Sequence, residues 1–314
     1  MYFKKKLIVS ATILLIIFLN MKHSYGLENK ILFKIEDEII TTIDIFEEIK
    51  FLKKFYQEIN NLSETELFEI SKNSILRDKI KKIEIMNFVK ELKVEEKYLT
   101  QFIRNKYSQK GFDSIENFEK YLTENELNIK LIKEKFTIEI IWNDLIYQKF
   151  NKKIVIDKEK IKNEILQNPQ KENQRELLLS EIVFNSNNKT DYKNKYEKIL
   201  FDIEKIGFKK TALIHSDSST ASNGGLIGWV NEDNLSQAIK KVISKLQSGQ
   251  FTKPIRTSSG FIIIKIEEEK KYTSKFNLDD KINEVIRFKT NDQLNQFSNM
   301  YFNKLKKNFT IYDL

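Results

Sequence analysis

The stretch "SNGGLIGWV", residues 222–230, contains Gly224, Gly225 and Gly228 in a chain that has only 8 glycines among 314 residues. Glycine adopts positive φ angles and allows close approach of the backbone, but it weakens helices and strands. A glycine cluster in a glycine-poor chain therefore predicts a loop of demanding geometry. The mostly apolar residues 226–230 at its end predict a strand that begins at this loop.

The residues on both sides of this loop predict a compact α+β unit. Apolar runs "ELLLSEIVF" and "GFIIIKI" are typical of buried strands, and the segments between them have helical periodicity. In chain order we expect a strand at 176–184, a helix at 193–206, a short helix ending near His215, the glycine loop with its strand at 226–230, a helix at 234–246 and a strand at 260–266.

The segment before this unit is predicted to be mainly helical. Residues 31–40 alternate apolar and polar around a turn at 36–38, which predicts a small β-hairpin, and Thr41 or Thr42 can cap the helix that follows. From there to about residue 168 the apolar residues recur at helical spacing, with breaks at 62–63, at 93–94, at Gly111 and near Asn125. A polar linker, "PQKENQ" at 169–174, ends the segment.

The tail from 278 to 314 returns to helical periodicity and has one apolar face. That face needs a packing partner, and we expect the N-terminal helices to provide it. The sequence therefore predicts an α+β fold with four segments: 1–26, a helical domain at 27–170, an α+β domain at 172–270, and a terminal helix at 275–314 that packs on the helical domain.

Residues 1–26 have the layout of a signal peptide. A basic start, "MYFKKK", precedes a 13-residue apolar run at 7–19, and Ser24 and Gly26 place small residues at a cleavage site. We predict cleavage before Leu27, periplasmic localisation and no stable membrane insertion after cleavage. An uncleaved anchor, which would make this an envelope-bound partner protein, is the alternative.

The composition excludes several kinds of chemistry. The chain has no cysteine, which rules out disulfides and thiolate sites, and His215 is the only histidine after the first 26 residues. We therefore expect no metal and no cofactor. The net charge of +9 is spread over many Lys and Glu residues, without a basic motif, so we expect no nucleic-acid partner.

Two longer phrases carry a resemblance to a known family. "FKKTALIHSDSSTASNGGLIGWV" and "LQSGQFTKPIRTSSGFIIIKI" resemble the parvulin-type peptidyl-prolyl isomerase domain. The segments "NKILFKIEDEIITTIDI" and "YFNKLKKNFTIYDL" resemble the SurA family of periplasmic chaperones. The resemblance implies a SurA-like chain with one parvulin domain, in which the glycine loop leads into a central strand beside the substrate cleft.

The sequence departs from active parvulins at the histidine positions. These domains carry one histidine on the first strand and another on the last, where this chain has Glu181 and Ile262. Ser218 stands where some members carry Cys or Asp. No catalytic residue is therefore assigned. We expect Glu181 to pair with a neighbouring lysine, His215 to serve as a structural residue at a helix end, and Trp142 to lie in the core.

The apolar proline pocket of the family is partly retained. Leu235 and Ile239 occupy positions where active members often have Met and Phe. The resemblance implies a substrate-binding surface made of Ile227, Val230, Leu235, Ile239, Thr257 and Ser259. Isomerisation needs no proton transfer, because the barrier is amide resonance of about 18–20 kcal/mol. Loss of the histidine pair should therefore reduce catalysis, which depends on pocket order, more than binding.

Two functions follow from this interpretation. The first is a periplasmic chaperone that binds unfolded outer-membrane or secreted polypeptides, with the outer-membrane assembly machinery as a further partner and the parvulin-like domain acting mainly in peptide binding. The alternative is an active peptidyl-prolyl cis-trans isomerase that assists the folding of exported proteins.

Overall fold

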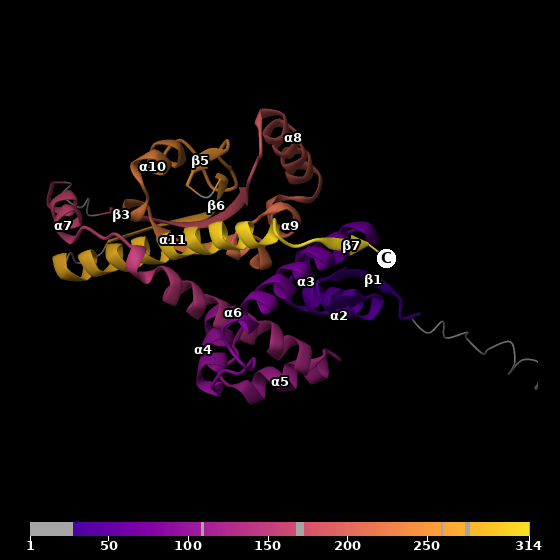
Figure 1. Ribbon diagram of the computed structural model, residues 1–314. Helices are drawn as coiled ribbons and strands as arrows, with labels where there is room; N and C mark the ends of the chain where they lie inside the picture. The colour runs from indigo at the N-terminus through magenta and orange to yellow at the C-terminus, as the bar shows by residue number, and fades with distance from the viewer. Residues whose placement is uncertain (1–27, 108–109, 168–172, 259, 274–276, 314) are drawn as a thin grey trace, which may run out of the picture.

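The computed structural model describes residues 28–107, 110–167, 173–258, 260–273 and 277–313 (Figure 1). The predicted signal peptide lies outside the described residues. Within them the chain forms a helical part, an α+β module (residues 173–273) and a long terminal helix, α11 (Leu278–Lys306), that runs along both. Together with two small antiparallel sheets, this arrangement confirms the predicted α+β fold class.

The predicted N-terminal hairpin is present and is followed at once by a helix. Strands β1 (Ile31–Ile35) and β2 (Glu38–Thr41) pair in antiparallel register, and α2 (Thr42–Phe55) follows. Thr41 is the N-cap, because its hydroxyl accepts the Asp44 backbone N–H while the Asp44 carboxylate accepts the Thr41 N–H. This capping box satisfies two backbone donors at the start of the helix.

The helical part forms two apolar cores. Phe55, Tyr107, Phe118 and Phe136 are buried in the first, and Trp142, with no exposed surface, lies in the second as predicted. The helices are α2, η1 (Gln57–Asn61), α3 (Glu64–Met86), α4 (Glu96–Lys106), α5 (Ile115–Glu124), α6 (Ile129–Phe150), η3 (Asn151–Lys153) and α7 (Lys158–Gln167). The predicted breaks fall between these elements.

The module is built on a four-stranded sheet in the order β4-β3-β6-β5, in which every pair is antiparallel. Its elements are β3 (Asn173–Phe184), α8 (Lys189–Ile206), α9 (Phe208–His215), η4 (Ser219–Asn223), β4 (Leu226–Asn231), η5 (Glu232–Asn234), α10 (Gln237–Ile243), β5 (Ile255–Thr257) and β6 (Gly260–Thr273). Successive side chains of a strand point to opposite faces, so the sheet buries two separate clusters.

The two faces of the sheet have different covers. Ile182, Phe184 and Ile263 pack with residues of α8 and α9 on one face. On the other face Leu177, Leu179, Ile264 and Ile266 pack with Leu235, with α10 and with Phe288 of α11. We call this second face the cleft face.

The glycine cluster forms the predicted loop, but the strand that follows it, β4, lies at the edge of the sheet, so the expectation of a central strand is wrong. Gly224, at φ +62°, caps η4, and Gly225, at φ +81°, lies so close to β3 that an added Cβ would come within 2.2 Å of the Glu181 carbonyl oxygen. The Glu181 N–H donates to the Gly225 carbonyl at 2.8 Å. Gly225 is therefore needed both for its φ angle and for the space that it leaves.

Helix α11 packs on the helical part through aromatic side chains. The Trp142 indole N–H donates to the Ser298 hydroxyl at 2.9 Å, and Trp142 packs edge-on against Phe302, with ring centroids 6.4 Å apart. Phe150 stacks on Phe297 at 4.9 Å. Beyond the helix, β7 (Ile311–Asp313) pairs with β1, so the last described residues close the N-terminal sheet.

Several boundaries differ from the prediction. The helix expected at 234–246 is shorter, because Asn234 belongs to η5 and Ser236 caps α10. Strand β6 extends to Thr273, and residues Asn173 and Gln174 of the predicted linker pair with it. The tail ends in a strand instead of continuing as a helix. The first difference has a local cause, the cap at Ser236, whereas the two strands form by pairing with distant segments, β3 and β1.

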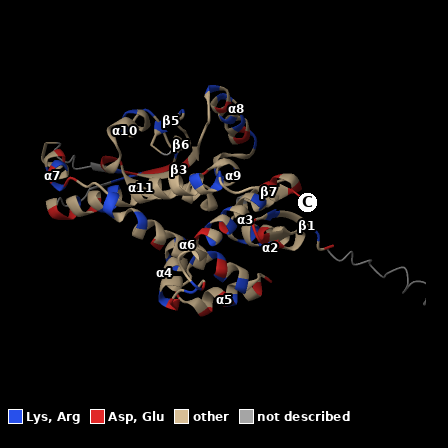
Figure 2. Ribbon diagram, viewed as in Figure 1, with Lys and Arg blue, Asp and Glu red and all other residues tan. Residues whose placement is uncertain are grey.

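Charged residues of both signs alternate along the helices (Figure 2). Among the described residues, no helix combines the length and the apolar character that a membrane span requires.

We propose that residues 27–170 and 275–314 form one folding unit. Phe302 is 6% exposed, and Phe302→Ala should lower the free energy of unfolding by about 3–5 kcal/mol, because it leaves a cavity against Trp142. Urea unfolding followed by far-UV circular dichroism measures this change. Phe201→Ala is the control, since Phe201 is 63% exposed and its loss should cost less than about 0.5 kcal/mol. Equal effects of the two substitutions would contradict the proposal.

Candidate functional site

The predicted pocket residues are only partly brought together. Val230 and Leu235 are buried in the cleft-face cluster, and Ile239 and Ile262 pack against it. Ile227 is 39% exposed and does not join these side chains. The four clustered residues form a small apolar surface, which we call the apolar seat.

The polar edge of the cleft also differs from the prediction. The Thr257 hydroxyl donates to the Gly260 carbonyl at 3.2 Å, within the turn between β5 and β6, and Ser259 lies outside the described residues. The residue between them, Ser258, reaches across the cleft and donates to the Gln296 side chain of α11 at 2.6 Å. Sequence comparison with the family had not singled out Ser258.

An aromatic ring of α11 already lies against the cleft-face cluster to which the apolar seat belongs. Phe288 packs on the cluster that contains Val230 and Leu235. The residues of α11 that meet the module share one face of the helix, because they recur every three or four positions. This α11 stripe consists of Glu284, Phe288, Asp292, Gln296 and Asn299.

Polar contacts hold both ends of the α11 stripe. The Asn234 side-chain amide donates to the Glu284 carboxylate at 2.7 Å, beside the apolar seat. At the other end the Ser219 backbone N–H donates to the Asn299 side-chain oxygen at 2.9 Å. The spacing of the stripe is visible in the sequence, but its hydrogen-bond partners lie 38 to 80 positions away along the chain, so sequence alone did not reveal the contact.

The two family histidine positions lie on the cleft face. In the β3–β6 register Glu181 is opposite Ile264 and Ile262 is opposite Val183, so both side chains belong to the face that α11 covers. Ile262 adds apolar surface to the seat, whereas Glu181 introduces a buried carboxyl group.

The Glu181 carboxyl group belongs to a chain of hydroxyl groups. It accepts a hydrogen bond from the Thr220 hydroxyl at 2.8 Å. The Thr220 hydroxyl is 2.7 Å from that of Ser218, which is 2.9 Å from that of Ser216. The Ser216 hydroxyl in turn accepts the Val183 backbone N–H at 3.0 Å. This row of hydroxyl groups joins η4 to β3 beside Glu181, the position that the resemblance assigns to the first family histidine.

The prediction that Glu181 pairs with a neighbouring lysine is wrong. Among the described residues no Lys or Arg nitrogen lies within 4.0 Å of its carboxylate, and the hydroxyls of η4 take that place. Burial raises the pKa of Glu181 to about 7, and the nearby Asp292 carboxylate of α11 adds to the rise. Burial also raises the pKa of Asp292.

His215 lies at the end of α9, as expected, and its imidazole bonds the Asp202 carboxylate at 2.5 Å. Burial lowers the pKa of His215. Helix α9 belongs to the layer that covers the opposite face of the sheet, so this imidazole does not face the apolar seat. The seat can hold an apolar ring. Among the described residues, no imidazole faces it that could hydrogen-bond and position the carbonyl group of a bound peptide.

The class of the module follows from its fold, its glycine loop and a family match. Residues 165–268 match the family described as Rotamase, PPIC-type PPIASE domain, the parvulin type. At the level of the whole chain, the resemblance to SurA-like chaperones with a parvulin domain is confirmed.

Two curated relatives carry this likeness. The chain is 25% identical over 204 residues to Chaperone SurA of Hahella chejuensis, a match that covers 62% of this chain and 46% of that protein. It is 28% identical over 225 residues to Foldase protein PrsA of Staphylococcus epidermidis, which covers 68% of this chain and 62% of that protein. The chain thus spans about half to three fifths of these relatives.

Among solved structures, PrsA of Bacillus anthracis matches with 17% identity and a TM-score of 0.30, covering 76% of this chain and 98% of that one.

The raised pKa of Glu181 predicts a pH dependence of stability. The unfolded group titrates near pH 4.5 and the folded group near pH 7, so the folded chain binds more protons between these values. Stability should therefore fall by about 3 kcal/mol as the pH rises from 4.5 to 7. Glu181→Gln should remove this decrease of the free energy of unfolding with pH, as measured by urea unfolding at several pH values.

Glu204→Gln, an exposed position on α8, is the matched control and should leave the slope unchanged. A slope that survives in Glu181→Gln would show that this carboxyl group stays ionised.

Proposed function

We propose that this protein is a periplasmic chaperone for unfolded outer-membrane or secreted polypeptides, in which the module binds peptide and isomerises proline bonds poorly. The observation that carries the proposal is the cleft face itself. It keeps an apolar seat within a cluster on which the Phe288 ring packs, while a buried Glu181 and an apolar Ile262 stand at the positions that the resemblance assigns to the histidine pair. Such a surface favours binding over catalysis.

The relatives support the chaperone role, because the matched proteins are named Chaperone SurA and Foldase protein PrsA. The signal-peptide layout of residues 1–26 supports export. Unfolded outer-membrane proteins expose alternating apolar side chains before their barrels close, and an apolar surface can hold these reversibly.

The helical part offers a second surface for clients. A groove of about 100 Å³ lies between α2, α3 and α6, and its apolar lining includes Phe51, Ile75, Leu131 and Ile138. Leu131 is 40% exposed, and on α2 Ile43 and Phe46 are each more than 40% exposed. These side chains place apolar contacts on the outside of the helical part, where an unfolded chain can reach them.

The isomerase alternative rests on the family match at residues 165–268. Isomerisation requires a site that favours the twisted amide over the planar one, and it requires no proton transfer. The apolar seat could supply part of that preference, so a direct assay decides between the two functions.

We expect the purified chain to suppress the aggregation of a porin diluted from urea, measured by light scattering. Deleting residues 172–272 and joining the ends by a short linker should preserve most of this activity, because the groove between α2, α3 and α6 remains. Absence of suppression by the full chain would refute the chaperone proposal.

In the module we expect peptide binding to compete with α11. Phe288→Ala should strengthen the binding of a fluorescent peptide that contains proline and phenylalanine by roughly tenfold, because it vacates the apolar seat. Leu235→Asp should weaken binding, because it places a charge there. Fluorescence anisotropy measures both, with Phe201→Ala as an exposed aromatic control. Unchanged binding in both variants would place the peptide elsewhere.

The same module should be a poor isomerase. Its kcat/KM on a prolyl tetrapeptide should be at least about tenfold below that of a histidine-containing parvulin, and Glu181→His combined with Ile262→His should raise it. Glu204→His adds a histidine far from the seat and is the control. A wild-type rate equal to that of active parvulins would move the protein to the enzyme class.

A further inference from the structure

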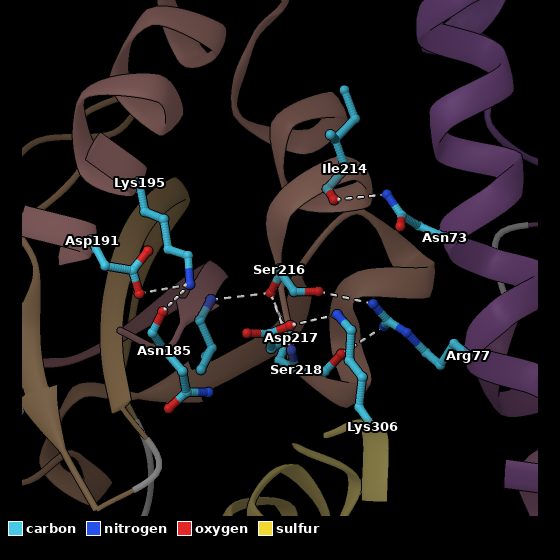
Figure 3. A network of polar contacts seen from close by, with 11 residues as sticks. Asn73, Arg77, Asn185, Asp191, Lys195, Ile214, Ser216, Asp217, Ser218 and Lys306 are labelled. Atoms are coloured by element: carbon cyan, nitrogen blue, oxygen red, sulfur yellow. Dashed lines mark hydrogen bonds and ion pairs between the residues drawn. The ribbon is translucent and has the colours of Figure 1, made fainter. Parts of the chain in front are cut away.

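A second cavity lies at the junction of the helical part, the module and the C-terminal segment. Its volume is about 260 Å³, and its lining comes from α3, the end of β3, α8, α9 with the residues that follow it, α11 and β7. It is on the α8–α9 side of the module and is separate from the apolar seat on the cleft face. Figure 3 shows several of the residues that line it, with their polar contacts.

The lining carries an excess of positive charge. Its permanently charged groups are the cations Arg77, Lys195, Lys198 and Lys306 and a single carboxylate, that of Asp217. His215 also lines the cavity, but its pKa is lowered by burial and it is bonded to Asp202. An anion inside this cavity would therefore experience net attraction from its walls.

The lysines of the rim are incompletely neutralised. Lys306 lies 3.5 Å from Asp217, and Lys195 lies 3.2 Å from Asp191, which stands outside the cavity lining. Lys198 has no hydrogen bond or ion pair with any described residue. Exposed lysine side chains are long and flexible, so these ammonium groups can turn toward a bound anion at little cost.

Arg77 brings a charge to the inner wall of the cavity. Its guanidinium donates to the carbonyl oxygens of Ser216 and Ser218, both at 2.8 Å, and lies 5.9 Å from the Phe302 ring centroid (Figure 3). Among the described residues no carboxylate lies within 4.0 Å of it, and burial lowers the pKa of Arg77. The carboxylates of Asp217, Asp78 and Glu139 partly offset this charge without contacting the guanidinium, which can still attract an anion that comes close to it.

The remaining lining is mixed: Asn73, Asn185 and Ser216 are polar, and seven side chains form an apolar surface. Of these seven, Ile80, Phe184, Ile199 and Phe302 are each less than 10% exposed, and the others are Leu76, Ile214 and Ile311. Inorganic phosphate would leave this surface without a partner. The cavity thus fits a ligand that joins one negative charge to an apolar group. At about 30 Å³ per water in the liquid, its volume corresponds to eight or nine waters, about the size of one large amino-acid residue.

We propose that this cavity binds the C-terminal residue of a polypeptide, with the free α-carboxylate at the lysine rim and an apolar side chain against Phe184, Ile199 and Phe302. The assignment of a polypeptide as ligand rests on the proposed chaperone function. Capture of a terminal carboxylate is a recurring mode of peptide recognition. Because α3, α8 and α11 all line the cavity, the bound residue would also hold the module against the helical part.

The test uses the full chain and an N-acetylated pentapeptide that ends in phenylalanine, as the free acid and as the C-terminal amide. Isothermal titration calorimetry should show at least about tenfold weaker binding of the amide, since it lacks the charge that the lysines contact. Lys198→Glu and Lys306→Glu should each weaken binding of the acid, and high salt should weaken it as well.

Lys193→Glu is the matched control, because Lys193 is also on α8 but pairs with Glu197 and does not line the cavity. Leu235→Asp, in the apolar seat, reports on the module cleft: it should lower only the binding that the acid and the amide share, and the difference between acid and amide should remain.

Equal binding of acid and amide, or equal losses in Lys193→Glu and Lys198→Glu, would overturn the proposal. So would binding of decanoate without binding of the peptide acid, since the ligand would then be a lipid carboxylate. If the acid binds all variants except Leu235→Asp, the peptide occupies the module cleft and this proposal is wrong. The proposed chaperone function would still stand.

Discussion

The packing of α11 between two bodies is the constraint on which the rest of the structure depends. One side of this helix is fixed to the helical part by the Trp142–Ser298 hydrogen bond and the aromatic contacts of Phe297 and Phe302. The α11 stripe on another side meets the cleft face of the module. A single helix therefore completes the core of one unit and covers the cleft face of the other.

This arrangement changes what the cleft can do. In a free parvulin-like domain the apolar seat would be open to a peptide, whereas here Phe288 packs on it and Asp292 lies near Glu181. Two carboxyl groups of raised pKa on facing elements mean that protonation and helix packing are linked. The row of hydroxyl groups from Thr220 to Ser216 gives the Glu181 carboxyl group a hydrogen-bond partner but no positive charge. The pKa of Glu181 therefore stays raised.

Features that depend on neighbouring residues could be predicted from the sequence. The β1–β2 hairpin and the cap at Thr41 depend on neighbouring residues, and Gly225 is fixed by its φ angle and its closeness to β3. The helix breaks in the N-terminal part and the burial of Trp142 also followed from periodicity and composition. The replaced histidines at Glu181 and Ile262 could be identified from the resemblance, because strand phrases preserve their register.

What the sequence by itself determined is thus the α+β class, the order of the elements and the identity of Glu181 and Ile262 at the two strand positions. Only the tertiary structure decided that Ile227 stays outside the apolar seat, that hydroxyls and not a lysine meet Glu181, and that Ser258 contacts α11. It also decided that Arg77 meets Ser216 and Ser218 across a cationic cavity. The physical reason is separation along the chain: these hydrogen bonds join residues between 38 and 141 positions apart, and no local pattern encodes which distant surfaces will meet.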